Sequence, residues 1–306
     1  MNKLLPIILL LITTSLMAGW KWEKLDIEVP YTNLGNASTY DPVRKKIVLL
    51  NATSANPADA YDMYLFDGRT FEKVCSRQPD SNFSCRLYSP SSLYWDMNLQ
   101  ELVTGQLCEQ FPSTGYLMSW LLKEDSMLCW KPFTYGMGVN VIFDPVRMKA
   151  VFFSLNLSEI YEYDGSSVAI YSTSVSFSDY AYLTYDELSR KVIYFGYSTS
   201  AKVNLCEWDG QTFEVVNPNP PQGYDIDNYS PYSIAYYPEL GGSVALYGTQ
   251  GALLYKDKNW YPLIKEKTPL GGLIIYYPPN KKMYLFSLFD GVYVLRRAHT
   301  RPFERE

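Results

Sequence analysis

Histidine is almost missing from this sequence. The 306 residues include a single His, His299, in a charged C-terminal tail. One imidazole cannot supply the paired His ligands of common zinc and copper sites, and it would have to serve as the base of any Ser-His-Asp triad. We therefore predict no metal site, no cofactor and no recognisable catalytic residues.

An excess of basic charge is also missing. The chain has 27 Lys and Arg against 32 Asp and Glu, a net charge of −5. Binding to nucleic acid uses a basic surface that neutralises phosphates. The net charge thus predicts no nucleic-acid partner, and it gives no support for adhesion to anionic lipid.

Long apolar runs are confined to the N-terminus. Asn2 and Lys3 precede the apolar run 4–17, which ends in the small residues Ala18 and Gly19. This pattern is typical of a secretory signal peptide. A transmembrane anchor is the alternative, but the run is shorter than the roughly 20 residues that cross a bilayer. We predict a signal peptide at 1–18, a secreted or periplasmic protein, and no membrane anchor after cleavage.

Cysteine is sparse, with five residues and no C-x-x-C pair. That excludes the usual redox and zinc-knuckle motifs. Export permits disulfides, and Cys75 and Cys85, which flank a polar segment, are the candidate pair. An odd number leaves at least one thiol unpaired within the chain.

Aromatic residues, in contrast, are abundant, and they occur in a repeat. The sequence has 28 Tyr, 14 Phe and 7 Trp, residue types that favour strands. The phrase YDPVRKK at 40–46 returns as FDPVRMK at 143–149 and, more weakly, four more times. Its marked position falls at Asp41, Asp96, Asp144, Asp186, Tyr237 and Tyr277. The mean spacing of about 47 residues is in the range of propeller blades.

Each repeat predicts two antiparallel hairpins. A strand ends in an aromatic residue, a turn with Asp and often Pro follows, and a Val-rich strand comes next. About 20 residues later a third strand ends in aromatic-Asp-Gly, as at 66–68 and 208–210, where Gly supplies the φ > 0 of a tight turn. A fourth strand then begins with Phe71, Phe213 or Trp260. The sequence therefore predicts an all-β fold, a six-bladed β-propeller with four antiparallel strands per blade.

The last repeat lacks its fourth strand, and the segment after the signal peptide resembles that strand. Trp22 stands there where Phe71 and Trp260 stand in their repeats. We expect the N-terminal strand to close the last blade, which removes unpaired edges. The predicted blades are 34–75, 88–134, 137–172, 178–217, 230–265, and 270–297 together with 20–27, within one domain at 19–297, and 298–306 form a tail.

These motifs resemble the kelch-type β-propeller family in its bacterial variant. The resemblance rests on aromatic-Asp-Pro at 40–42 and 143–145 and on aromatic-Asp-Gly-x-Thr-Phe at 66–71 and 208–213, and it spans nearly the whole mature chain. The double glycine that the family often carries after the second strand is missing. The resemblance implies a binding platform more often than an enzyme.

Two enzymatic propeller types do not fit the sequence. A single His cannot form the copper site of galactose oxidases, and the spacing of the Asp-Gly motif differs from the sialidase box. Aspartates that return in several blades indicate turns, since a catalytic residue is needed only once. We therefore expect a protein that is not an enzyme.

Residues that break the repeat are the better candidates for a site. They lie in or near the interblade loops and in the loops between second and third strands, which share one face, and loops on a rigid scaffold often carry binding residues. Aromatic side chains with polar tips suit glycan or peptide contacts, although blade cores use them too. The ligand-binding candidates are Tyr88, Phe111, Tyr116, Tyr135, Tyr180, Tyr182, Tyr224, Asp225, Asp227 and Tyr232.

We expect an exported, non-catalytic propeller that recognises a protein or glycan on this loop face. One alternative is a carboxylate-dependent carbohydrate-active enzyme on the same face, with an acid and a base among Asp80, Glu109, Asp179, Asp225 and Asp227. Another is an assembly scaffold of the cell envelope.

Overall fold

The structure is a computed structural model that describes most of the chain after residue 18. The described ranges are 19–31, 34–52, 61–77, 92–108, 111–120, 129–131, 140–154, 158–198, 203–216, 221–222, 231–247, 251–269, 272–287 and 291–298. Of these residues nearly all are in strands or tight turns.

The strands follow one another with a single short 3-10 helix, η1 (Pro278–Asn280), among them. The first half of the chain forms β1 (Trp20–Lys24), β2 (Leu34–Asp41), β3 (Lys46–Ala52), β4 (Tyr61–Phe66), β5 (Phe71–Arg77), β6 (Ser92–Asp96), β7 (Glu101–Cys108), β8 (Phe111–Trp120), β9 (Cys129–Lys131), β10 (Asn140–Asp144), β11 (Lys149–Phe153) and β12 (Glu159–Tyr163). The second half forms β13 (Val168–Ser172), β14 (Phe177–Asp186), β15 (Lys191–Ser198), β16 (Val203–Trp208), β17 (Phe213–Val215), β18 (Pro231–Tyr237), β19 (Gly242–Tyr247), β20 (Ala252–Lys256), β21 (Asn259–Ile264), β22 (Gly272–Tyr277), β23 (Lys282–Ser287) and β24 (Gly291–Arg297).

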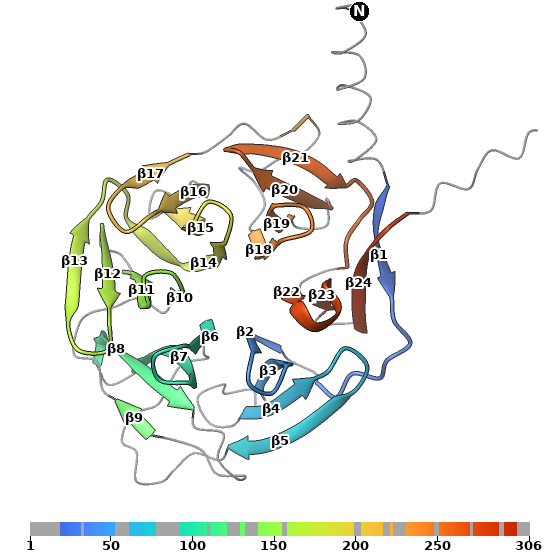
Figure 1. Ribbon diagram of the computed structural model, residues 1–306, viewed down its shortest axis with the longest axis horizontal. Helices are drawn as coiled ribbons and strands as arrows, with labels where there is room; N and C mark the ends of the chain where they lie inside the picture. The colour runs from blue at the N-terminus through green and yellow to red at the C-terminus, as the bar shows by residue number, and fades with distance from the viewer. Residues whose placement is uncertain are drawn as a thin grey trace, which may run out of the picture.

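Within the described residues these strands form six four-stranded antiparallel sheets arranged around a central axis (Figure 1). Blades 1 to 5 are β2–β5, β6–β9, β10–β13, β14–β17 and β18–β21, and blade 6 is β22–β24 with β1. The innermost strand of each blade is its first, so β2, β6, β10, β14, β18 and β22 surround the axis. The predicted all-β propeller of four-stranded blades is confirmed.

The N-terminal strand completes blade 6. β1 pairs with β24 along its whole length, and Trp22 lies opposite Leu295. Phe71 lies opposite Phe66 and Trp260 opposite Tyr255 in the same way. Trp22 therefore occupies the fourth-strand position that the repeat assigned to it. The pairing brings strands from the two ends of the chain together (Figure 1).

The repeated aspartates form the turns of the blades. In the first turn of blade 1, the Asp41 carboxylate accepts the N–H groups of Val43 and Arg44 at 2.8 and 2.9 Å. In the second turn, Asp67 accepts the N–H groups of Arg69 and Thr70, both at 2.8 Å. The same pair of bonds is made by Asp96, Asp144, Asp164, Asp186 and Asp209. An aspartate in this position replaces backbone bonds that the tight turn cannot make.

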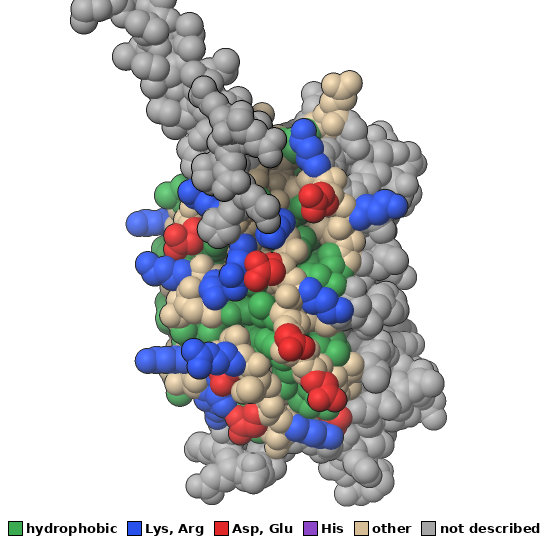
Figure 2. Space-filling model, turned by 90° about the vertical axis from the view of Figure 1, so that its right-hand side faces the viewer, with side chains coloured by type: hydrophobic (Ala, Val, Ile, Leu, Met, Phe, Trp, Pro, Cys, Tyr) green, Lys and Arg blue, Asp and Glu red, His purple; other side chains and the backbone are tan. Residues whose placement is uncertain are grey.

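The apolar core lies between neighbouring sheets. Blades 6 and 1 pack Phe66 and Ile47 against Tyr284 and Phe286, and comparable clusters join blades 2 to 3, 3 to 4, 4 to 5 and 5 to 6. Blades 3 to 6 thus bury apolar side chains on both faces. At the rim near β1 and β24, hydrophobic, basic and acidic side chains are interspersed, and Lys and Arg side chains project along one edge (Figure 2). Among the described residues, no helix has the length and apolar character to cross a membrane.

Candidate functional site in the central channel

The innermost strands bring residues from all six blades to one level of the central channel. Counting back from the turn position of each repeat, residues three or four places earlier line the channel at this level. Since a strand rises about 3.3 Å per residue, this level lies roughly 10–13 Å from the turns. This level is nearer to the end of the channel where the inner strands begin. The connections between blades enter at that end.

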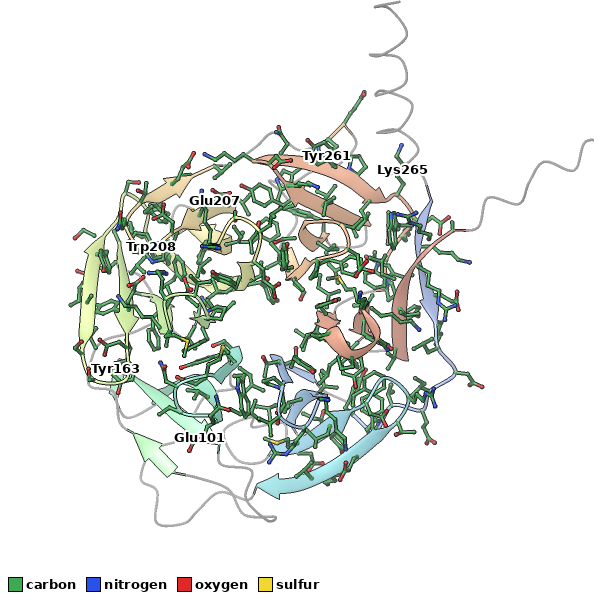
Figure 3. The ribbon with its side chains drawn as sticks, viewed as in Figure 1. Glu101, Tyr163, Glu207, Trp208, Tyr261 and Lys265 are labelled. Carbon is green, nitrogen blue, oxygen red and sulfur yellow. The ribbon has the colours of Figure 1, made fainter. Side chains whose placement is uncertain are left out.

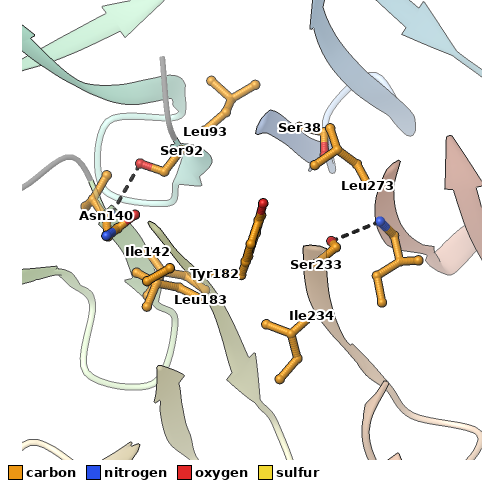
Figure 4. Close-up of a pocket in the computed structure, with 13 residues that line it drawn as sticks. Ser38, Ser92, Leu93, Asn140, Ile142, Tyr182, Leu183, Ser233, Ile234 and Leu273 are labelled. Carbon is orange, nitrogen blue, oxygen red and sulfur yellow. Dashed lines mark hydrogen bonds between the residues drawn. The ribbon is translucent and has the colours of Figure 1, made fainter. Parts of the chain in front are cut away.

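A cavity of about 90 Å³ lies at this level (Figure 4). At the ~30 Å³ that a water molecule takes in the liquid, this space equals about three waters. Its described lining consists of Ser38, Ser92, Leu93, Asn140, Val141, Ile142, Ala181, Tyr182, Leu183, Ser233, Ile234, Leu273 and Ile274. The space is large enough for one functional group of a ligand, while a whole sugar ring would extend out of it.

Hydrogen bonds between blades hold this level of the channel. The Ser92 hydroxyl of blade 2 accepts the N–H of Val141 in blade 3 at 3.2 Å. Ser233 of blade 5 accepts the N–H of Ile274 in blade 6 at 3.1 Å (Figure 4). One pleat nearer the turns, Thr184 accepts the N–H of Tyr236 at 2.9 Å. These N–H groups therefore point to the channel side of their strands, away from the second strand of each blade.

The channel wall carries hydrogen-bond donors and acceptors. In an antiparallel ladder a residue directs its N–H and its C=O to the same side, so Val141 and Ile274 turn both groups inward. Leu93, Leu183 and Ile234 occupy the equivalent position of their blades. No charged side chain is among the described lining residues, and burying an unpaired charge there would be costly. The lining is suited to a neutral group that both donates and accepts.

Tyr182 is the largest side chain in the cavity. It stands on β14, half-buried, with part of its ring packed on the core between blades 4 and 5. Figure 4 shows the ring extending into the channel, with the hydroxyl directed toward the wall that carries Ser38 and Leu93. An aromatic face beside hydroxyl and amide groups is a common contact surface for a sugar.

The repeated carboxylates lie away from this level and are engaged in turns. Two N–H bonds from Ser167 and Ser166, with both of their hydroxyls, lower the pKa of Asp164. Burial alone would raise the pKa of Asp209, but the N–H groups of Thr212 and Gln211 outweigh it and lower the value. Both carboxylates stay ionised and accept hydrogen bonds from their own turns, which suits a structural role.

Two further glutamates, both buried, connect the outer layers of neighbouring blades. Glu162 of blade 3 accepts the indole N–H of Trp208 in blade 4 at 2.7 Å and is paired with Arg147 and Lys149. Burial alone would raise the pKa of Glu162, and these donors together lower it. Glu207 of blade 4 likewise accepts the Tyr255 hydroxyl of blade 5 at 2.5 Å. Glu207 and Trp208 lie on the third strand of their blade, away from the channel (Figure 3).

Of the ten predicted ligand contacts, Tyr182 is the one whose side chain the structure describes. Phe111, Tyr116, Tyr180 and Tyr232 lie in β8, β14 and β18, and their side chains are outside the described part. Tyr88, Tyr135, Tyr224, Asp225 and Asp227 are outside it entirely, as is Cys85 of the expected disulfide. Cys206 is buried with a free thiol, and burial raises its pKa to about 12. The sequence did not single out Ser92, Asn140 or Ser233, although each stands four residues before a turn position.

No family model and no curated protein matches this chain. The kelch resemblance thus stays a prediction.

Solved structures, in contrast, match along nearly the whole chain. A luciferin-regenerating enzyme aligns at a TM-score of 0.59 with 10% identity, covering 92% of this chain and 98% of its own. A gluconolactonase from Xanthomonas campestris aligns at 0.56 with 11% identity, covering 92% of both chains. YCF48 bound to D1 peptide aligns at 0.50 with 14% identity, covering 87% of this chain and 79% of its own. At these identities the likeness establishes the fold.

The matches correct one expectation. We expected a protein that is not an enzyme because no catalytic motif was recognisable, but propellers of this architecture include proteins named as enzymes. The physical reason is that a propeller site is assembled from single residues of several blades, about one repeat apart in sequence. A search for linear motifs cannot detect such a site, so the lack of a catalytic motif in the sequence does not exclude catalysis.

Proposed function

We propose that this protein is a carbohydrate-active enzyme that receives part of a neutral, hydroxylated substrate in the central channel. The observation that carries the proposal is the neutral ring of hydroxyl and backbone groups around Tyr182. Sugar hydroxyls donate and accept at once, so they can bond to the C=O groups and the side-chain hydroxyls of the wall; the N–H groups of Val141 and Ile274 already donate to Ser92 and Ser233. The cavity of about 90 Å³ accepts one or two such groups, and the remaining substrate lies toward the loop face.

The charges favour a neutral ligand over an ion. A carboxylate or an ammonium group at this level would meet no counter-charge among the described lining side chains, and its desolvation would be uncompensated. The repeated carboxylates belong to the turns, where each accepts two backbone N–H groups.

The acid and base would come from carboxylates outside the turns. Asp179 precedes Tyr182 by three residues on β14, and Asp225 and Asp227 lie in the interblade loop before β18. A pair of carboxylates is sufficient for acid–base attack on a glycosidic bond or a sugar lactone. Two solved neighbours bear enzyme names, and one is named for a sugar lactone, which supports this class of reaction.

Turnover by the purified protein tests the proposal. A panel of sugar lactones and glycosides is screened, and Asp179→Asn, Asp225→Asn and Asp227→Asn are each compared with the native chain. Loss of the acid or base should lower kcat by about 10²-fold or more. Tyr182→Ala should raise KM for the same substrate, since it removes the aromatic contact surface and its hydroxyl while leaving the proposed carboxylates in place.

The turn variant Asp164→Asn is the control, because its carboxylate is exposed and bound to its own turn. It should keep full activity. Absence of turnover across the panel, or equal loss in Asp164→Asn and the other variants, would reject the proposal.

A second candidate function is recognition of a protein or peptide on the same face. YCF48 was solved with a D1 peptide and another neighbour in a nidogen–laminin complex, and the predicted loop aromatics suit such contacts. A role as a cell-envelope scaffold would use the same face. Pull-down from envelope extracts distinguishes recognition of a partner from catalysis on small substrates. The combined variant Tyr88→Ala, Tyr224→Ala and Tyr232→Ala should abolish capture of a partner and leave turnover of small substrates intact.

Export also remains a proposal. N-terminal sequencing of protein recovered from the periplasm or medium should begin near Gly19. Recovery of an uncleaved chain from the cytoplasm would contradict it.

A further inference from the structure

The tight turns of the blades form one surface, at the end of the propeller opposite the connections between blades. In each blade the turn after the first strand and the turn after the third strand lie at the same end, because the strands alternate in direction. The Asn98 side chain of blade 2 donates to the backbone C=O of Met148 in blade 3 at 2.9 Å. Tyr277 of blade 6 donates to the C=O of Lys45 in blade 1 at 2.7 Å. These bonds join neighbouring turns into a continuous surface, which we call the turn face.

Exposed apolar side chains occupy one part of the turn face. Of the seven large hydrophobic side chains that the described residues expose, five stand on the first turns of blades 1 to 4. They are Val43 in blade 1, Met97 in blade 2, Val146 and Met148 in blade 3, and Leu188 in blade 4, with exposed fractions of 37–66%. Neither the core nor the channel site uses them. Clustered apolar side chains on a surface indicate an interaction site.

Aromatic residues stand at the inner margin of the same face. The residue just before the turn position is aromatic in every blade: Tyr40, Trp95, Phe143, Tyr185, Tyr236 and Tyr276. All of them except the buried Phe143 are half-buried, so part of each of these side chains is exposed. Tyr and Trp are the residues that most often anchor protein–protein interfaces. The turn face therefore has the composition of a protein-binding surface.

Some charged side chains of the first turns are exposed and form no ion pair within the described part of the chain. The basic ones are Lys45, Arg190 and Lys281 in blades 1, 4 and 6, which share the left-handed corner of their turns with φ of 55–57°. The acidic ones are Glu187 in blade 4 and Glu239 in blade 5. These five side chains are available to a partner.

The turn face as a whole is mixed in charge. Most other Lys and Arg side chains of the first turns are paired with carboxylates of their own blade. The second turns expose the acids Asp67, Asp164, Asp209 and Asp257. Such a surface does not suit a uniformly charged partner, whether a nucleic acid or an anionic membrane. It suits a protein surface that carries apolar groups and both signs of charge.

We propose that the turn face binds the turn face of a second copy of this chain, in a two-fold symmetric dimer. Turning the second copy over reverses the order of its blades, and each contact of such an interface occurs twice. With the two-fold axis passing between blades 5 and 6 and between blades 2 and 3, blade 1 lies opposite blade 4, blade 2 opposite blade 3, and blade 5 opposite blade 6.

This arrangement matches the apolar side chains. Val43 of blade 1 lies opposite Leu188 of the second copy's blade 4, and Met97 of blade 2 lies opposite Val146 and Met148 of its blade 3. Blades 5 and 6, whose described first turns expose no large hydrophobic side chain, lie opposite each other. The restriction of the apolar residues to blades 1 to 4 therefore agrees with the symmetry.

The same arrangement matches the unpaired charges. Lys45 of blade 1 lies opposite Glu187 of blade 4, and Lys281 of blade 6 lies opposite Glu239 of blade 5. Rotating the second copy by one blade would place either Lys281 or Glu239 opposite its own equivalent, and like charges in contact are unfavourable. The charges thus select one orientation. The dimer leaves the loop end of both channels open, so the inference does not depend on the proposed enzymatic function.

Sedimentation equilibrium of the purified full chain, over a series of concentrations, tests the dimer. We expect the native chain to sediment with the mass of two copies. Glu239→Lys and Lys281→Glu, each alone, should raise the dissociation constant roughly tenfold or more, since each places like charges opposite each other at both symmetric contacts. The double variant Val43→Ser and Leu188→Ser should weaken the dimer as well, because it removes an apolar contact that occurs twice.

Mixing the two charge variants tests the orientation. A dimer of one Glu239→Lys chain and one Lys281→Glu chain has an acid opposite a base at both contacts, so the equimolar mixture should regain the dimer that neither variant forms well alone. Glu266→Lys and Lys267→Glu are the matched controls. Both residues are exposed in the connection between blades 5 and 6, at the other end of the propeller, and both variants should dimerise like the native chain. Circular dichroism with a thermal melt verifies that every variant is folded.

Three outcomes would overturn the inference. The first is a native chain that stays monomeric at every concentration, including one that binds a different protein through the turn face. The second is a dimer that the turn-face variants leave unchanged or that the controls weaken equally. The third is an equimolar mixture of the two charge variants that remains as dissociated as each variant alone.

Discussion

Gly165 and Gly210 occupy the same position in the second turns of blades 3 and 4, both with φ of +96°. A Cβ on Gly165 would meet nothing within 4 Å, whereas a Cβ on Gly210 would clash with the guanidinium of Arg147. That guanidinium is held by Asp144 and Glu162, so it cannot move aside without breaking buried ion pairs. Two glycines with one backbone conformation therefore have different packing requirements.

We expect Gly165→Ala to cost about 1 kcal/mol of unfolding free energy, which is the strain of a side chain at positive φ. Gly210→Ala should cost about 2 kcal/mol more, because it also displaces Arg147. Urea unfolding of both variants measures the difference. Equal costs would show that Arg147 is free to move.

Glu162 gives a prediction about pH. Its pKa is lowered in the folded state, so its stabilisation is complete above the ordinary carboxyl pKa of ~4.3. The stabilisation is lost as the pH falls through the lowered folded value. At pH 7, Glu162→Gln should reduce the unfolding free energy by about 3 kcal/mol, because the partly buried Arg147 and Lys149 lose the carboxylate that they share.

The difference between Glu162→Gln and the native chain should shrink in acid below the unfolded pKa. Thermal melts over a series of pH values follow it. Glu214→Gln, which removes an exposed pair with Lys258, is the control and should change little. A difference for Glu162→Gln that stays constant into acid would contradict the assignment.

The inner strands of neighbouring blades are joined by hydrogen bonds as well as by apolar packing. Each inner strand has one edge on its own blade and one edge on the channel. Ser92 and Ser233 satisfy channel-side N–H groups of the next blade. These bonds fix how one blade stands against its neighbour at the level of the cavity.

We expect Ser92→Ala and Ser233→Ala each to cost about 1 kcal/mol, the usual net worth of such a bond. The sharper readout is hydrogen exchange, which should accelerate at the amide of Val141 in the first variant and of Ile274 in the second. Ser38→Ala, also in the cavity lining, is the control and should change neither amide. Unchanged exchange in all three would place the hydrogen bonds elsewhere.

The whole molecule depends on closure of the ring. β1 covers the edge of β24, and Trp20 and Trp22 pack against the core between blades 5 and 6. An uncovered β24 would expose a row of unpaired backbone groups, which favours pairing with other chains. The strand thus contributes to solubility as well as to stability.

Trp22→Ala should lower the unfolding free energy by about 2–3 kcal/mol, since it removes part of a large apolar contact. Lys21→Ala on the same strand is the control, because Lys21 is exposed, and it should have little effect. Deleting 20–24 should cause the protein to aggregate, measured by size-exclusion chromatography against the native chain. A monomeric, fully stable deletion variant would contradict the importance of closure.

The sequence predicted the repeat, and of the described residues that line the channel it named one, Tyr182. The turn aspartates, the paired hairpins and the place of Trp22 all follow from local rules, since each depends on residues within one hairpin or on comparison between copies. Tyr182 was among the predicted contacts, but Ser92, Asn140 and Ser233 were not, because a Ser or Asn before a turn carries no local signal.

The sequence by itself determined the all-β propeller of four-stranded blades, because its turns and strands are local and repeat about every 47 residues. The tertiary structure alone decided which side chains of different blades meet. Ser92 and Val141 are 49 residues apart, and Glu162 and Trp208 are 46 apart. Such pairs come together because neighbouring blades are rotated about one axis, and that rotation also gathers the channel lining.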